Sequence, residues 1–201
     1  MTDYRIKKID ELCKTKGPVI RSSILRSAGF CGKDTYELIQ LGLIQRLRRG
    51  YYVSSIKLND MDNYEMLTAL VPNAVISLFS AAQYHDLSSV IPQKIDITLP
   101  NYKRIPVLPD NLQVNIYKAI PRIYEVGIQT VKEKEYSMKI YDRERTVCDF
   151  FRMRFQIGKD CAFEALKNYM AGKKNLQKLY EYAEILQIKG VLHPYLEVLA
   201  A

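Results

Sequence analysis

The stretch LIQLGLIQRLRRGYYV, residues 38–53, changes its hydrophobic period halfway along its length. Its first part carries apolar residues at helical spacing, with Gly42 at the place where a helix would end in a left-handed cap. From residue 44 the period is two, and this alternation predicts that three side chains share one side of a strand: Ile44, Arg46 and Arg48. Gly50 then allows a tight turn into the strand-forming run Tyr-Tyr-Val. The stretch therefore predicts a helix followed by a basic β-hairpin.

The residues before this stretch predict two more helices. Residues 4–16 have apolar residues at helical spacing and lysines on the opposite face, and Gly-Pro ends this helix. A short extended run follows, and Ser22 or Ser23 can then cap a second, very short helix. A third helix begins near residue 32 and runs to residue 41. Helix, short helix, tight turn, helix and basic hairpin is the element order of a winged helix-turn-helix.

A winged helix-turn-helix predicts two kinds of DNA contact. One helix enters the major groove, while a basic wing holds the neighbouring phosphates. The outward face of the third helix carries the candidates for base contact: Lys33, Thr35, Tyr36 and Gln40. The candidates for phosphate contact are Arg46, Arg48 and Arg49 in the hairpin, with Ser22 and Ser23 at a helix N-terminus. Two alternatives remain open, namely a solvated hairpin and a winged domain that contacts another protein.

The distribution of charge favours DNA. Of the chain's net charge of +8, residues 1–57 carry +7, with 12 Lys and Arg against 5 Asp and Glu. Residues 58–201 hold 18 basic and 17 acidic residues, a net charge of +1. An excess of positive charge in one segment is typical of a module with a polyanionic partner. We therefore predict a DNA-binding domain over residues 1–57 and a neutral domain over residues 58–201, with the boundary in the polar run LNDMDN.

The second part of the chain predicts a mixed α/β domain. Helices are expected over 64–71 and from Ser77 to residue 84, and strands over 94–99, 112–117, 126–132 and 137–140. Asp142 is the predicted N-cap of a helix with Arg145 at its third position, and three more helices are expected over 159–170, 174–187 and 191–199. The whole chain is thus predicted to be α+β, with a small sheet and a helical C-terminal end.

Catalytic motifs and metal-ligand patterns are absent from the sequence. There is no P-loop, GxGxxG or GxSxG motif, and the four cysteines and two histidines have no zinc-site spacing. Arg143, Glu144, Arg145 and Asp149 are best interpreted as a salt-bridged helix start, with a partner or nucleic-acid contact as the alternative. We therefore predict no catalytic residues, no metal and no cofactor, and regard an unrecognised nuclease as the weakest alternative.

Targeting signals are also absent. No apolar run approaches the roughly 18 to 20 residues that a membrane span needs, and the first residues lack a signal-peptide core. We expect a cytoplasmic protein with reduced cysteines and no membrane partner.

Three segments in this order resemble one family. They are VIRSSILRSAGFCGKDTYELIQLGLIQRLRRGYYV from residue 19, VISLFSAAQYHDLSSVIPQKIDITLP from residue 75, and IYDRERTVCDFF from residue 140. Together they resemble the AbiEi antitoxins of type IV toxin–antitoxin systems, which serve in abortive infection and phage defence. The resemblance spans about residues 17 to 170 and depends on the order and spacing of the segments.

The resemblance implies a winged helix-turn-helix that binds inverted repeats in its own promoter and a C-terminal domain with antitoxin activity. DNA contacts carried over by position fall on the third helix and on Arg46, Arg48, Arg49 and Tyr51. The family's toxin is a nucleotidyltransferase-like protein, AbiEii, which the antitoxin opposes without a stable complex. The alternative is a stand-alone transcriptional regulator whose C-terminal domain senses a ligand or a partner.

Overall fold

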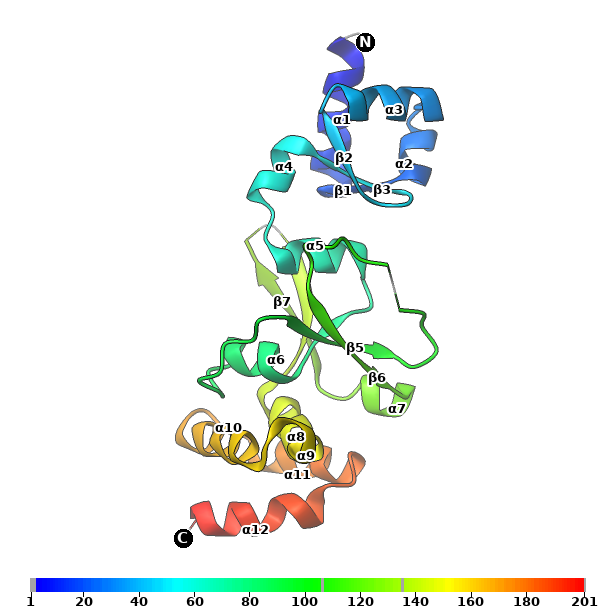
Figure 1. Cartoon of the computed structure of the whole chain (residues 1–201). Helices are drawn as coiled ribbons and strands as arrows, with labels where there is room; N and C mark the ends of the chain where they lie inside the picture. The colour runs from blue at the N-terminus through cyan, green and yellow to red at the C-terminus, as the bar shows by residue number, and fades with distance from the viewer. Residues whose placement is uncertain (1–2, 106, 135, 201) are drawn as a thin grey trace. The chain divides into compact units, whose positions relative to one another are not determined.

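The segment around residues 38–53 forms a helix and a hairpin, as its change of period predicts. A computed structural model describes residues 3–105, 107–134 and 136–200 (Figure 1). Helix α3, Gly32–Gln40, is followed by Gly42 in the left-handed region, with φ of 67°, and strands β2, Ile44–Arg48, and β3, Tyr51–Ser54, form an antiparallel hairpin. Gly50 has φ of 81° at the turn, a conformation that L side chains rarely adopt.

The chain divides into two compact units. The first consists of residues 3–72 and 107–112, and the second of residues 73–105 and of the chain from residue 113 onward. The boundary predicted at residues 57–58 falls inside helix α4, Ser55–Asp60, because α4 contacts β3 and helix α5, Asn63–Leu70, contacts the first strand. The polar composition of LNDMDN reflects a connection within the first unit.

The first unit combines five helices with a three-stranded antiparallel sheet in the order β1-β3-β2, counted over the residues that the structure describes. Before α3 come α1, Asp3–Lys16, β1, Val19–Arg21, and α2, Ser22–Ser27. Its core is a cluster of buried apolar side chains from α1, β1, α2, α3 and β2: Ile9, Ile20, Leu25, Phe30, Leu38 and Ile44. These side chains come from different helices and strands and from the turn before α3. Because they pack in one cluster, this core fixes how α2, α3 and the hairpin lie relative to one another.

The serines at the start of α2 do not cap it, contrary to the prediction. Arg21 is the N-cap residue, in an extended conformation, and its side chain makes no capping hydrogen bond. Ser22 is already helical, and its backbone N–H donates to the carbonyl of Gly50 at 2.8 Å. The helix N-terminus is therefore tied to the hairpin turn through the backbone.

The second unit contains a five-stranded mixed sheet in the order β6-β5-β4-β8-β7. Its strands are β4, Val75–Ile76, β5, Ile95–Pro100, β6, Val114–Ala119, β7, Ile128–Glu133, and β8, Tyr136–Tyr141. Strands β4–β8 and β5–β6 pair in parallel, whereas β4–β5 and β7–β8 are antiparallel. The central strand, β4, has only two residues and was not predicted from the sequence, since so short a run gives no periodic signal.

Most helices of the second unit follow the last strand of its sheet along the chain (Figure 1). They are α6, Leu78–Tyr84, α7, Pro121–Tyr124, α8, Arg143–Arg152, α9, Arg154–Ile157, α10, Lys159–Ala171, α11, Leu176–Ile185, and α12, Lys189–Ala200. Helix α8 is central: α6, α10, α11 and α12 all contact it, and its apolar side chains Val147, Cys148, Phe150 and Phe151 are almost fully buried. The fold is mixed α+β, with small sheets and a helical C-terminal end, as predicted.

The start of α8 follows the predicted pattern. The Asp142 carboxylate accepts a hydrogen bond from the Arg145 backbone N–H at 2.8 Å, and Arg145 forms an ion pair with Asp149 at 3.0 Å. The four cysteines are free thiols. Within the described residues, no helix has the length and apolar character that crossing a membrane requires.

Candidate functional site

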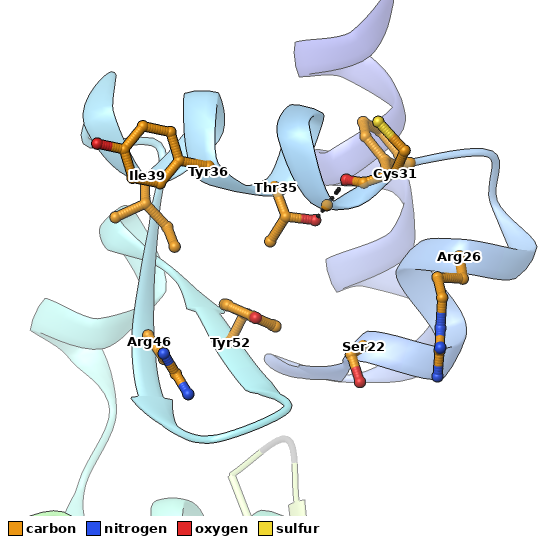
Figure 2. A pocket seen from close by; sticks show the side chains of 10 residues that line it. Ser22, Arg26, Cys31, Thr35, Tyr36, Ile39, Arg46 and Tyr52 are labelled. Carbon is orange, nitrogen blue, oxygen red and sulfur yellow. Dashed lines mark hydrogen bonds between the residues drawn. The ribbon is translucent and has the colours of Figure 1, made fainter.

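A groove in the first unit lies among α2, α3 and the hairpin. It encloses about 320 Å³, and side chains from all three elements line it (Figure 2). Helix α3 contributes Thr35, Tyr36 and Ile39; Ile39 lies four residues after Thr35 and three after Tyr36, so it shares a helix face with both. The hairpin contributes Arg46 and Tyr52, which are opposite each other in the β2–β3 register and so share one face of the sheet.

Helix α2 supplies the opposite wall of the groove. Ser22 and Arg26 are four residues apart, and both line the space. Arg26 and Arg46 are exposed, and thus two guanidinium groups from different elements lie on the same groove. An arginine carries its charge at any physiological pH and can form bidentate hydrogen bonds to a phosphate. The groove can therefore hold a polyanion between two cationic walls.

Helix α3 is capped at its first turn. The Asp34 carboxylate accepts a hydrogen bond from the Cys31 N–H at 2.8 Å, while Leu38 is fully buried. The Thr35 hydroxyl donates to the Cys31 carbonyl at 3.0 Å, so it is engaged with the helix's own backbone. Tyr36 lines the groove and is 65% exposed.

Four of the ten predicted contact residues line this groove: Ser22, Thr35, Tyr36 and Arg46. Ser23, Lys33, Gln40 and Arg49 are exposed on the same elements or on the hairpin turn but do not line it. Arg26, Ile39 and Tyr52 also line the groove and were not predicted from the sequence. The spacing of Ser22 and Arg26 on α2 was the available signal for Arg26.

Arg48 and Tyr51 lie on the other face of the hairpin. The β2–β3 register shifts between Arg46 and Arg48, so that Arg46 pairs with Tyr52 and Arg48 with Tyr51. Such a bulge adds one residue to a strand and reverses the alternation beyond it. The predicted sharing of one side by Arg46 and Arg48 is therefore wrong.

The Arg48 guanidinium is engaged inside the first unit. It donates to the Leu70 carbonyl at 2.9 Å and to the Val107 carbonyl at 3.3 Å, and its central carbon lies 3.9 Å from the centre of the Tyr51 ring. These contacts join the hairpin to the end of α5 and to residues 107–112. Arg48 thus has a structural role in place of the predicted phosphate contact.

The charge of the first unit is lower than that of its first 57 residues. Residues 58–72 and 106–112 add no Lys or Arg but four acidic residues: Asp60, Asp62, Glu65 and Asp110. The first unit then has 12 basic and 9 acidic residues, a net charge of +3, and the rest of the chain has 18 and 13, a net charge of +5. The basic character of the groove is therefore local, and the second unit is not neutral.

No protein-family model matches the chain, and no curated protein does. Among solved structures, the chain is similar to the crystal structure of the RV2827C protein from Mycobacterium tuberculosis, with a TM-score of 0.46 and 16% sequence identity. The match covers 90% of this chain and 75% of that chain.

Proposed function

We propose that the first unit is a winged helix-turn-helix that binds double-stranded DNA. The observation that carries this proposal is the groove, where two arginines from α2 and β2 flank the exposed face of α3. A recognition helix needs a neighbouring helix to hold it across the DNA backbone and benefits from cations beside it. In the first unit, α2 supplies that neighbour and the β2–β3 hairpin is the wing.

We expect the exposed side chains of the first unit to form two groups, one that contacts base edges and one that contacts phosphates. The exposed side chains of α3, Lys33, Tyr36 and Gln40, face the base edges. Arg26, Arg46 and Ser22 contact phosphates, and Arg49 and Ser23 extend this set at the hairpin turn and on α2. Arg48 and Tyr51 are excluded because they stack on each other on the opposite face of the hairpin. The alternative, a winged domain that contacts another protein, needs no cations in the groove.

Binding should depend strongly on salt. About three to six phosphate contacts predict a slope of log affinity against log salt of about −3 to −5, since each contact releases condensed counterions. The measurement is fluorescence anisotropy of the full chain on a labelled duplex from its own promoter, between about 50 and 200 mM salt, with a scrambled duplex as the control. A slope near zero, or equal affinity for both duplexes, would contradict the proposal.

Base preference should depend on α3. Replacing Gln40 or Lys33 with Ala should alter the preferred sequence by about 1–3 kcal/mol of discrimination at one base position, while leaving the affinity for scrambled DNA nearly unchanged. The measurement is a competition assay with a library of single-base operator variants. Ser27→Ala at the end of α2 is the control, since Ser27 is exposed and does not line the groove. An unchanged base profile in both α3 variants would remove α3 from base recognition.

We further propose that this DNA binding represses the protein's own operon and that the protein acts as a type IV antitoxin against a nucleotidyltransferase-like toxin. The support is the resemblance of three segments to the AbiEi antitoxins together with the groove. The test is co-expression with the neighbouring gene that encodes such a toxin. Arg46→Glu should then derepress the promoter while protection from the toxin persists. If protection is lost with repression, the protein is a stand-alone transcriptional regulator.

A further inference from the structure

The part of α3 that lines the groove includes a purely aliphatic side chain. Ile39 is four residues after Thr35, so the two lie one above the other on the helix, and Figure 2 shows the Ile39 side chain pointing from α3 toward the hairpin. Ile39 is half-buried, since part of it packs against the core of the first unit while the rest lines the groove. At this position the groove offers a ligand no hydrogen bond.

The Thr35 hydroxyl is already committed as a donor. It donates to the Cys31 carbonyl at 3.0 Å, the bond that is dashed in Figure 2. In the same view the methyl group of Thr35 points away from that bond and toward the middle of the groove. Thr35 and Ile39 therefore present aliphatic groups side by side, and we call these two residues the apolar strip of α3.

Charged and polar side chains lie on either side of the apolar strip. Arg26 on α2 and Arg46 on β2 line the walls of the groove, and the exposed Tyr36 is next to the strip on α3. A base edge that rests against the strip finds no free donor there. A base nitrogen or oxygen placed on the strip would lose its water without a replacement, which is unfavourable. The strip therefore favours an apolar group of the DNA.

The major groove of B-DNA presents such a group on one base, the C5-methyl group of thymine, whereas the other groups that distinguish its base pairs there are hydrogen-bond donors and acceptors. We propose that Thr35 and Ile39 recognise thymine by van der Waals contact with its C5-methyl group. This inference rests on the proposed DNA binding and refines it, because it names the base that this part of α3 selects.

The test removes the methyl group and nothing else. Each thymine of the promoter duplex is replaced in turn by uracil, which has the same hydrogen-bonding groups and lacks the C5-methyl group, and fluorescence anisotropy measures the affinity of the full chain. At the thymines that contact the strip we expect a loss of about three- to fivefold, as the burial of one methyl group predicts. At the other thymines the affinity should not change.

Variants assign that loss to the strip. Thr35→Ser keeps the hydroxyl and removes the methyl group, and Ile39→Ala removes most of the aliphatic side chain, so each should lose the preference for thymine over uracil at the position it contacts. Thr35→Val keeps methyl groups and should retain the preference. The control is Ser27→Ala, at an exposed residue that does not line the groove. The preference is a ratio measured within one variant, so a partly unfolded population does not alter it.

The outcomes separate this inference from the proposed function. If uracil is tolerated at every position while the promoter duplex still binds with the expected salt dependence, the inference is overturned and the DNA-binding function stands. The inference also fails if Thr35→Ser and Ile39→Ala both keep the preference of the parent, or if Thr35→Val loses it. If the chain binds the promoter duplex no better than the scrambled one, the proposed function fails and the inference fails with it.

Discussion

Arg46→Glu should lower the affinity of the full chain for its promoter duplex by roughly 100-fold or more at moderate salt. The substitution removes a phosphate-binding cation and places a carboxylate on the groove, so that attraction becomes repulsion. Arg46 is exposed on β2, and its neighbour across the hairpin is Tyr52, so the fold should tolerate the change. Anisotropy measures the affinity, and circular dichroism checks the fold.

The control for this experiment is Arg122→Glu, which makes the same change of charge at an exposed arginine of α7 in the second unit. It should leave affinity within about threefold of the parent, because Arg122 does not line the groove and so supplies none of the phosphate contacts proposed there. Equal losses in the two variants would mean that overall charge, and not the groove, governs binding. The assigned role of Arg46 would then be wrong.

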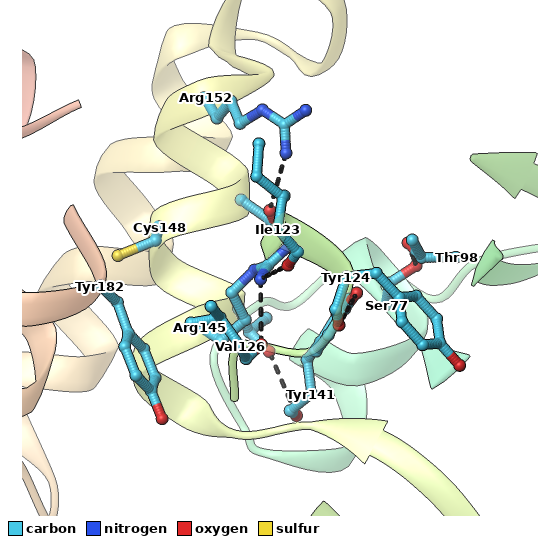
Figure 3. Close-up of polar contacts among 12 residues, drawn as sticks. Ser77, Thr98, Ile123, Tyr124, Val126, Tyr141, Arg145, Cys148, Arg152 and Tyr182 are labelled. Atoms are coloured by element: carbon cyan, nitrogen blue, oxygen red, sulfur yellow. Dashed lines mark hydrogen bonds and ion pairs between the residues drawn. The ribbon is translucent and has the colours of Figure 1, made fainter. Parts of the chain in front are cut away.

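Arg145→Ala should lower the free energy of unfolding by about 3–5 kcal/mol, because it leaves the buried carboxylate of Asp149 with only a 3.8 Å contact to Arg152. The same change removes the donor to two backbone carbonyls, those of Ile123 and Val126, which are then left unsatisfied (Figure 3). It also removes a guanidinium that lies 4.2 Å from the centre of the buried Tyr141 ring. The measurement is urea denaturation followed by circular dichroism.

The double variant Arg145→Met with Asp149→Leu tests whether the loss of stability comes from the charge of Asp149 left in the interior. Replacing both members of a buried pair by apolar residues is often neutral or stabilising, so the double variant should recover much of the loss of the single one. The comparison is Lys189→Ala, which breaks an exposed ion pair to Glu184 and should change stability by less than about 1 kcal/mol. If Arg145→Ala costs no more than Lys189→Ala, the buried pair does not hold α8 in place.

Local rules predicted the helices of the second unit well. The Asp142 cap, the Arg145–Asp149 pair and the three final helices follow from side-chain spacing and from N-cap chemistry, which involve residues a few positions apart. The same rules predicted α3, the left-handed Gly42 and the hairpin. Each of these features depends on residues that are only a few positions apart in the sequence, so their interacting groups are close together before the rest of the chain folds.

Features that depend on distant residues were not predictable in this way. The bulge between Arg46 and Arg48 reverses the faces of the hairpin, and period-two alternation cannot anticipate the extra residue. The partners of Arg48 are carbonyls of Leu70 and Val107, 22 and 59 residues away along the chain. The domain boundary failed for the same reason, since α5 and residues 107–112 join the first unit through tertiary contacts.

The hydrogen bonds of Arg48 bear on whether the two units can be separated from each other, by cleavage of the backbone or by recombination of the gene. Because residues 107–112 return to the first unit, the backbone passes between the two units three times. Arg48 donates one hydrogen bond to the Leu70 carbonyl, shortly before the first of these crossings, and another to the Val107 carbonyl, just after the second. A single nick after residue 72 would therefore leave residues 107–112, which belong to the first unit, on the fragment that carries the second unit. By the same topology, no continuous gene segment encodes the first unit alone, so recombination transfers it intact only together with the second.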